Sequence, residues 1–225
     1  MVFGYGRATT GQQRSFKRRR TGKKGYNNFK FNPPTQNRRA ISRSPGEIKI
    51  SDTAINDPAV DGTAVFHLLN GMEDGSAMGE RIAQEVKNLT IRLKWTAQTD
   101  AAAPQTQHRY MLVWDNQPNA TGPGITDILT ATDIEAYNNV NTRRRFNILM
   151  NKVIDFPSGA AGEGTRKRYL EYSYDIGKKT YYNGGQSGLI GDIVTGALWF
   201  VSFGTGAGGS ADGSAQGVAR LYYYG

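Results

Sequence analysis

The chain of 225 residues contains 28 Lys and Arg, 19 Asp and Glu, and no cysteine. The absence of cysteine excludes disulfide bonds, thiolate metal sites and a cysteine nucleophile. The sequence has no apolar leader at its N-terminus and no apolar run long enough to span a bilayer, so we expect a soluble, intracellular protein that does not insert into membranes.

The first 43 residues form a strongly basic arm. They contain twelve Lys and Arg and no Asp or Glu, which leaves 16 basic against 19 acidic residues in the remaining 182. This change in composition predicts a basic, arginine-rich N-terminal arm over residues 1–45 and a folded domain over residues 46–225. Because the arm has little apolar surface to bury, we expect it to be disordered unless a partner or a neighbouring subunit orders it.

The composition of the arm is typical of a segment that binds single-stranded nucleic acid. Lys and Arg neutralise phosphates, and aromatic rings placed among them can stack on unpaired bases. An anionic membrane surface is a weaker partner, because the arm has no amphipathic apolar stripe to insert. The candidate binding residues are Arg7, Arg14, Lys17, Arg18, Arg19, Arg20, Lys23, Lys24, Lys30, Arg38, Arg39, Arg43, Phe16, Tyr26, Phe29 and Phe31.

One part of the arm also matches a nuclear import signal. Such signals are short, dense clusters of Lys and Arg. Import would add a second role to the arm and would not replace nucleic-acid binding. The residues of this cluster are Lys17, Arg18, Arg19, Arg20, Lys23 and Lys24.

From Glu47 onward the periodicity is that of β-strands. In the clearest case Leu89, Ile91, Leu93 and Trp95 alternate with polar residues, which predicts a half-buried antiparallel strand. Residues 109–114 are apolar on both faces, as expected of a central strand in a two-layer fold. We predict eight strands, at residues 47–55, 63–70, 88–96, 109–114, 146–156, 169–176, 192–203 and 218–224.

The sequence predicts one short helix. Thr132 and Glu135 have the Thr-x-x-Glu spacing of a capping box, in which each side chain bonds the other residue's backbone N–H. We therefore expect a helix over residues 133–138.

Eight strands in about 180 residues, joined by long and uneven loops, predict an all-β fold. The jelly roll, an eight-stranded antiparallel sandwich, fits this number of strands best. An immunoglobulin-type sandwich is the alternative, although it is usually shorter and has tighter loops.

The folded domain carries two basic clusters, each just before or at the start of a predicted strand. Because these two strands follow one another in the chain, the clusters could form one secondary basic patch. A solvated loop end or a salt bridge between subunits explains them equally well. The residues are Arg143, Arg144, Arg145, Arg166, Lys167 and Arg168.

Catalysis and cofactor binding find little support. His67 and His108 are the only histidines, and neither a nucleophile elbow nor a metal-binding helix accompanies them. Residues 204–209 contain Gly-x-Gly-x-x-Gly, but a strand is predicted after them, so a pyrophosphate would meet no helix N-terminus. We therefore predict a protein that is not an enzyme and has no cofactor and no metal site.

Several short stretches, in this order, carry a family resemblance. They are EIK (47–49) with DT (52–53), LLNGM (68–72), GERI (79–82) with KNLTIR (87–92), RYMLVWDNQP (109–118), FNIL (146–149) with Lys152, and ARLYYY (219–224). Together with the basic arm, they make the chain resemble the single-jelly-roll capsid proteins of small circular Rep-encoding single-stranded DNA viruses, the circovirus and geminivirus-like group. The chain is also similar to the coat proteins of satellite plant viruses.

The resemblance implies a capsid protein that assembles into an icosahedral shell of sixty copies, with the arm facing a single-stranded genome. It favours DNA over RNA, and it implies a location in the virion and, during assembly, in the host nucleus. The implied partners are further copies of the chain, the genome, nuclear import receptors and an unknown host receptor. The residues alone leave an alternative open, a nucleic-acid-binding β-domain with a basic tail that does not assemble.

Overall fold

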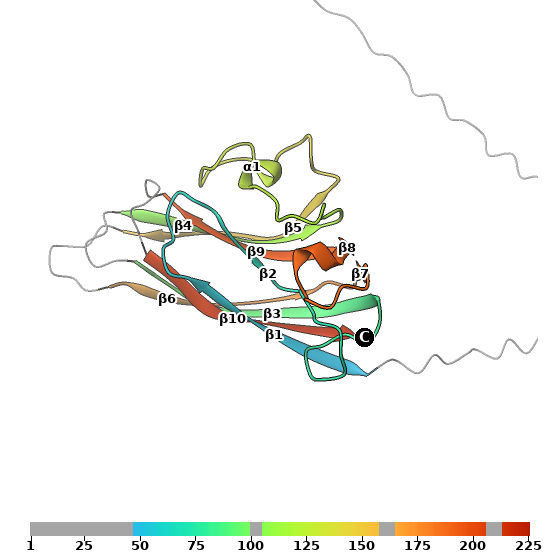
Figure 1. Ribbon diagram of the computed structural model, residues 1–225. Coiled ribbons are helices and arrows are strands. Elements are labelled where there is room, and N and C mark those ends of the chain that lie inside the picture. The colour runs from blue at the N-terminus through green and yellow to red at the C-terminus, as the bar shows by residue number, and fades with distance from the viewer. Residues whose placement is uncertain (1–46, 100–104, 158–164, 206–212) are drawn as a thin grey trace, which may run out of the picture. The chain divides into compact units, whose positions relative to one another are not determined.

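The computed structural model describes residues 47–99, 105–157, 165–205 and 213–225. These residues form two antiparallel sheets that pack face to face as two layers (Figure 1). The elements are β1 (Ile48–Asp57), β2 (Val65–Leu68), β3 (Glu85–Thr99), β4 (Thr106–Asp115), α1 (Ile125–Ile128), β5 (Phe146–Phe156), β6 (Lys167–Asp175), β7 (Lys179–Tyr182), the 3₁₀ turn η1 (Ile190–Asp192), β8 (Ile193–Thr195), β9 (Ala197–Gly204) and β10 (Gly213–Tyr224).

The strand order is that of a jelly roll. One sheet has the order β1-β10-β3-β7-β8, with β6 also paired to β3, and the other has the order β2-β9-β4-β5. Strands β6 and β7 occupy one position in the sheet, because β6 pairs with residues 90–98 of β3 and β7 with residues 85–87. When β6 and β7 are counted as one strand and the short edge strand β8 is left aside, eight strands remain. The chain passes to the other sheet after each of them except β4, which pairs with β5 in the same sheet. The predicted all-β, eight-stranded antiparallel jelly roll is confirmed.

The alternation that predicted the strands reflects burial between the sheets. Ile91, Leu93 and Trp95 in β3 are almost completely buried, while Arg92 and Lys94 between them are exposed. Residue Trp95 packs edge-on against two rings of the other sheet, Tyr110 at 5.6 Å and Phe200 at 5.5 Å between ring centroids. Such aromatic pairs add to the free energy that area burial alone provides.

Strand β4 is buried on both faces, as predicted for residues 109–114. One face of its sheet lies against the six-stranded sheet, and α1 with the chain around it lies over the other face (Figure 1). Strand β9, which pairs with β4, is likewise buried at every position.

The predicted strand over residues 192–203 is wrong in one respect, because the chain changes sheets within it. Strand β8 pairs with β7 in the six-stranded sheet, whereas β9 pairs with β2 and β4 in the other. Gly196 between them has φ of +80°, and a Cβ there would lie 2.6 Å from the Trp114 ring. The buried Asn70 side chain donates to the Gly196 carbonyl and accepts from the Leu198 N–H, each at 2.8 Å. Glycine therefore permits the change of sheet, and Asn70 holds it.

The predicted helix over residues 133–138 is also wrong. These residues form a turn, and the only α-helix among the described residues is the single turn α1. The reason is tertiary: the buried Arg109 guanidinium donates to the carbonyl oxygens of Ile134 at 2.8 Å and Ala136 at 2.9 Å. These carbonyls therefore point toward β4 and are not arranged along a helix axis.

Candidate nucleic-acid and subunit surfaces

All candidate residues of the arm, from Arg7 to Arg43, lie outside the described residues, and so do the import cluster and the boundary at residue 45. The structure therefore places only the candidate residues of the folded domain.

The two basic clusters of the domain lie at opposite ends of β5, so the prediction of one patch is wrong. Residues 143–145 precede Phe146, the first residue of β5. Arg168 lies near the other end, with its Cζ 6.0 Å from the centroid of the Phe156 ring. Strand β5 has 11 residues, a length of roughly 33 Å. The two clusters are close in sequence because they precede consecutive strands. Between them, however, the chain runs the length of β5 and then passes into the other sheet.

Within the first cluster, Arg145 has a role in the fold. Its Nε and Nη2 donate to the two carboxylate oxygens of Asp115 at 2.9 and 2.8 Å, and Asp115 is completely buried. The hydrogen bond to Asp115 raises the pKa of Arg145. Of the remaining cluster residues, Arg143, Arg144, Lys167 and Arg168 are exposed, and Arg166 is half-buried.

The outer face of the six-stranded sheet brings together charges that the sequence does not group. The strand register places Asp52, Arg220 and Arg92 in one row across β1, β10 and β3. Arg220 donates to both Asp52 oxygens at 2.8 and 2.7 Å, which lowers the pKa of Asp52. In the next row Lys94 lies 3.4 Å from Glu171. In these two rows Asp52 and Glu171 are thus each paired with a cation.

Arg92 lies in the first of these rows and has an aromatic neighbour. Its guanidinium carbon lies 5.3 Å from the centroid of the Tyr222 ring, and no described carboxylate forms an ion pair with it. Both side chains line a hollow of about 400 Å³ together with Val218. A cation beside an aromatic ring can contact a phosphate and a base at the same time.

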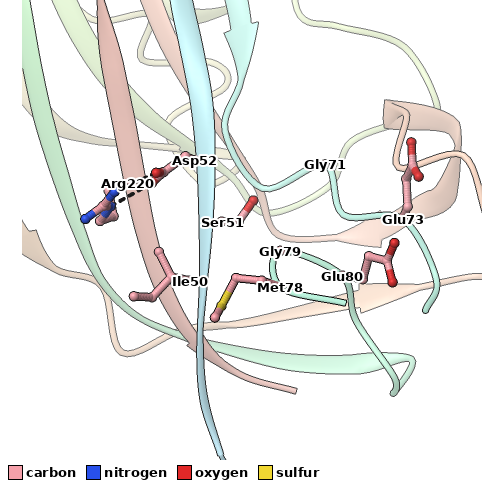
Figure 2. Close-up of a pocket in the computed structure, with 9 residues that line it drawn as sticks. All are labelled: Ile50, Ser51, Asp52, Gly71, Glu73, Met78, Gly79, Glu80 and Arg220. Carbon is pink, nitrogen blue, oxygen red and sulfur yellow. Dashed lines mark hydrogen bonds and ion pairs between the residues drawn. The ribbon is translucent and has the colours of Figure 1, made fainter. Parts of the chain in front are cut away.

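A second hollow, of about 600 Å³, lies beside the edge strand β1 (Figure 2). Figure 2 shows Asp52 and Arg220 on one side of it and Glu73 and Glu80, from the chain between β2 and β3, on the other. The lining has three carboxylates and one guanidinium, so its charge does not suit a phosphate backbone. Of the two hollows, the one at Arg92, lined by three cations and one carboxylate, has the charge that suits a phosphate.

The two histidines lie in different strands of the four-stranded sheet, His67 in β2 and His108 in β4. Residue His108 is completely buried, with Nδ1 3.1 Å from the Tyr110 hydroxyl, and burial lowers its pKa to about 4. No group of three or more metal-binding side chains occurs within the described parts of the chain. No helix there is long and apolar enough to cross a membrane.

We expect acid to destabilise the fold through His108. An unfolded histidine binds a proton near pH 6.5 and the folded one only near pH 4, so stability falls as the pH drops between these values. The loss at pH 4.5 relative to pH 7 should be about 2–3 kcal/mol. Urea unfolding of the wild type and of His108→Gln at both pH values measures it. An equal loss in the variant would assign the effect to other groups.

Two facing antiparallel sheets in this strand order, with a filled aromatic core and charged outer strands, define a jelly-roll sandwich, a fold used by viral capsid domains. The family model of the satellite tobacco necrosis virus coat protein matches residues 13–219. The chain belongs to this family of viral coat proteins. Of the two groups that the sequence resembles, the match thus supports the satellite plant viruses.

Solved structures give weaker similarity. The fold is similar to that of Desmodium yellow mottle tymovirus, with a TM-score of 0.33 and 10% identity over 79% of this chain and 88% of that one. It is also similar to dimeric latent PorU from Porphyromonas gingivalis, with a TM-score of 0.31 and 8% identity over 79% of this chain and 13% of that one. No curated protein matches the chain.

Membership of the family gives the chain a structural role. A coat protein is a component of the virion and assembles with further copies of itself.

Proposed function

We propose that the chain forms a small icosahedral shell of sixty copies and packages a single-stranded nucleic acid through its basic arm. The observation that carries this proposal is the family match, which spans residues 13–219 and so includes most of the arm as well as the domain. Sixty arms of twelve charges supply on the order of 700 positive charges, which offset a comparable number of phosphates. The phosphates of a strand of about one to two kilobases outnumber these charges, and small counterions neutralise the phosphates that the arms do not.

Binding through the arm should depend steeply on salt. Each phosphate that a Lys or Arg contacts releases counterions, so for about ten contacts on a single strand the slope of log K against log salt should be about −7. Fluorescence anisotropy with a labelled single-stranded oligonucleotide, repeated across a range of NaCl concentrations, measures this slope. A slope near zero would contradict binding by the arm.

The expectation of DNA rested on the resemblance to the circular DNA viruses, to which the family match does not extend. The proposal therefore specifies a single strand, and its chemical type is measured directly. Nucleic acid extracted from particles should be degraded by a nuclease specific for single strands, and separate treatment with DNase and RNase assigns the sugar.

The import cluster, Lys17 to Lys24, is proposed as a separate function of the arm. A fluorescent protein fused to residues 1–45 should accumulate in the nucleus, and the same fusion with these basic residues changed to Gln should not. An even distribution of both fusions would contradict the import signal without affecting packaging.

Arg92 and Tyr222 are proposed as a secondary contact with the genome. Replacing Arg92 with Ala should weaken oligonucleotide binding a few-fold and reduce the magnitude of the salt slope by about one. The control is Lys94→Ala on the same strand, because Glu171 already compensates the charge of Lys94. If both variants bind as the wild type does, the sheet face does not contact nucleic acid. The exposed Arg143, Arg144, Lys167 and Arg168 are proposed contacts at two separate places.

A further inference from the structure

The outer side of the four-stranded sheet contains a hollow that has no counterpart in the sites above. It has a volume of about 660 Å³ and lies between β4, β5 and the turn at residues 134–140. The described surface is apolar at its rim, where Tyr137, Val140 and Val153 have exposed fractions of 84%, 65% and 46%. Exposed apolar side chains that surround a concave site are typical of a surface that binds another molecule.

The floor of the hollow is a buried cation. Residue Arg109 has an exposed fraction of only 4%, and burial lowers its pKa. Its Nε donates to Asn151 at 2.9 Å, and its Nη1 donates to backbone carbonyls of the covering turn. No described residue accepts a hydrogen bond from Nη2, and no described carboxylate forms an ion pair with the guanidinium. A guanidinium N–H without a protein acceptor at the floor of a hollow is available to donate to an incoming oxygen.

The charges around the hollow restrict the incoming group. Glu135 is exposed and lines the hollow, and the carboxylate of Asp133 also acts on the charge of Arg109. The site as a whole is therefore near neutral, which disfavours a phosphate strand or a carboxylate-rich segment. An apolar segment that presents a backbone carbonyl oxygen satisfies both the rim and Nη2.

We infer that this hollow is a contact between subunits and receives an apolar segment of a second copy of the chain. The inference rests on the proposed shell, in which every subunit must bury surface against its neighbours. A concave site cannot pack against an identical concave site, so the contact joins two different surfaces, the arrangement that produces closed rings. Met78 and Leu189, exposed by 78% and 65%, are candidate counterparts elsewhere on the chain.

A matched pair of valines tests the inference. Val153 lies at the hollow and Val194 on the edge strand β8 of the other sheet, and their exposed fractions are 46% and 50%. The variant Val153→Asp should need about tenfold more protein to assemble, or should fail to assemble, while Val194→Asp should assemble almost as the wild type does. Thermal unfolding of dissociated subunits shows whether each variant is folded. Assembly of folded Val153→Asp at the wild-type concentration would overturn the inference.

Photo-cross-linking identifies the occupant even if Val153→Asp does not fold. Tyr137 is replaced by p-benzoylphenylalanine in one sample, and Tyr169, 64% exposed on the other sheet, in a second. Irradiated particles should yield covalent dimers from position 137 and none, or far fewer, from position 169. Cross-links from position 137 that stay within one chain, or that reach nucleic acid, would overturn the inference. If the wild type itself never assembles, the proposed function fails instead.

Discussion

Removing residues 1–43 should leave a chain that still folds and assembles but encloses almost no nucleic acid. The deletion removes twelve positive charges and no negative ones, and the remaining 182 residues contain 16 basic against 19 acidic residues. A subunit with a net negative charge gains nothing from counterion release by phosphates, so the driving force for packaging disappears. The ratio of absorbance at 260 and 280 nm of purified particles should fall to that of a protein.

The control keeps the arm and removes only its charge. In this variant all twelve Lys and Arg of residues 1–43 are changed to Gln, so the length and the aromatic residues of the arm stay as they are. It should package as poorly as the deletion does, which would separate charge from length. Particles of either variant with the full nucleic-acid content of the wild type would refute the role assigned to the arm.

Replacing Arg145 with Met should cost about 3–5 kcal/mol of folding free energy. The change leaves the Asp115 carboxylate buried without its cation, since Asp115 is completely buried and its other hydrogen bond comes from the Gln117 N–H. Removing one partner of a buried ion pair is among the most destabilising single changes, because the other charge stays buried without compensation. Urea unfolding of the variant and the wild type at neutral pH gives the difference.

The matched control is Arg220→Met. Arg220 makes the same bidentate pair of hydrogen bonds to Asp52, at 2.8 and 2.7 Å, but the two side chains are 49% and 44% exposed. An exposed pair contributes little to stability, because water compensates both charges when the pair is broken, so Arg220→Met should unfold at nearly the same urea concentration as the wild type. If the two variants lose equal stability, burial of Asp115 does not control the strength of its ion pair.

The sequence predicted features that depend on neighbouring residues along the chain. Alternation of Ile91, Leu93 and Trp95 with charged residues is a local signal, and the structure buries all three. The change of sheet at Gly196 could not be predicted, because the continuous apolar run through it suits either sheet. The false helix at residues 133–138 has a similar cause, since its capping-box pattern is local whereas Arg109, which bonds its carbonyls, lies some 25 residues earlier in the chain.

The candidate surfaces also depend on contacts between residues that are far apart in the chain. Charge counting located the arm, but the row of Asp52, Arg220 and Arg92 requires the strand register, which joins residues 168 apart in the case of the ion pair. The two basic clusters were predicted to be adjacent because they precede consecutive strands. The length of β5 and the change of sheet after it separate them in the structure. The hollow at Arg109 has no sequence signal, because an arginine within an apolar strand gives no sign of which of its donors lacks an acceptor.

The central claim is that this coat protein closes into a shell around nucleic acid, and electron microscopy of the purified chain tests it most directly. One fraction serves both for negative-stain images and for the absorbance ratio at 260 and 280 nm. We expect uniform closed particles of about 1.5 MDa, the mass of sixty copies, with an absorbance ratio typical of nucleic acid. A dispersed monomer or small oligomer that binds nucleic acid without closing into particles would contradict the claim and would indicate a binding domain with a basic tail.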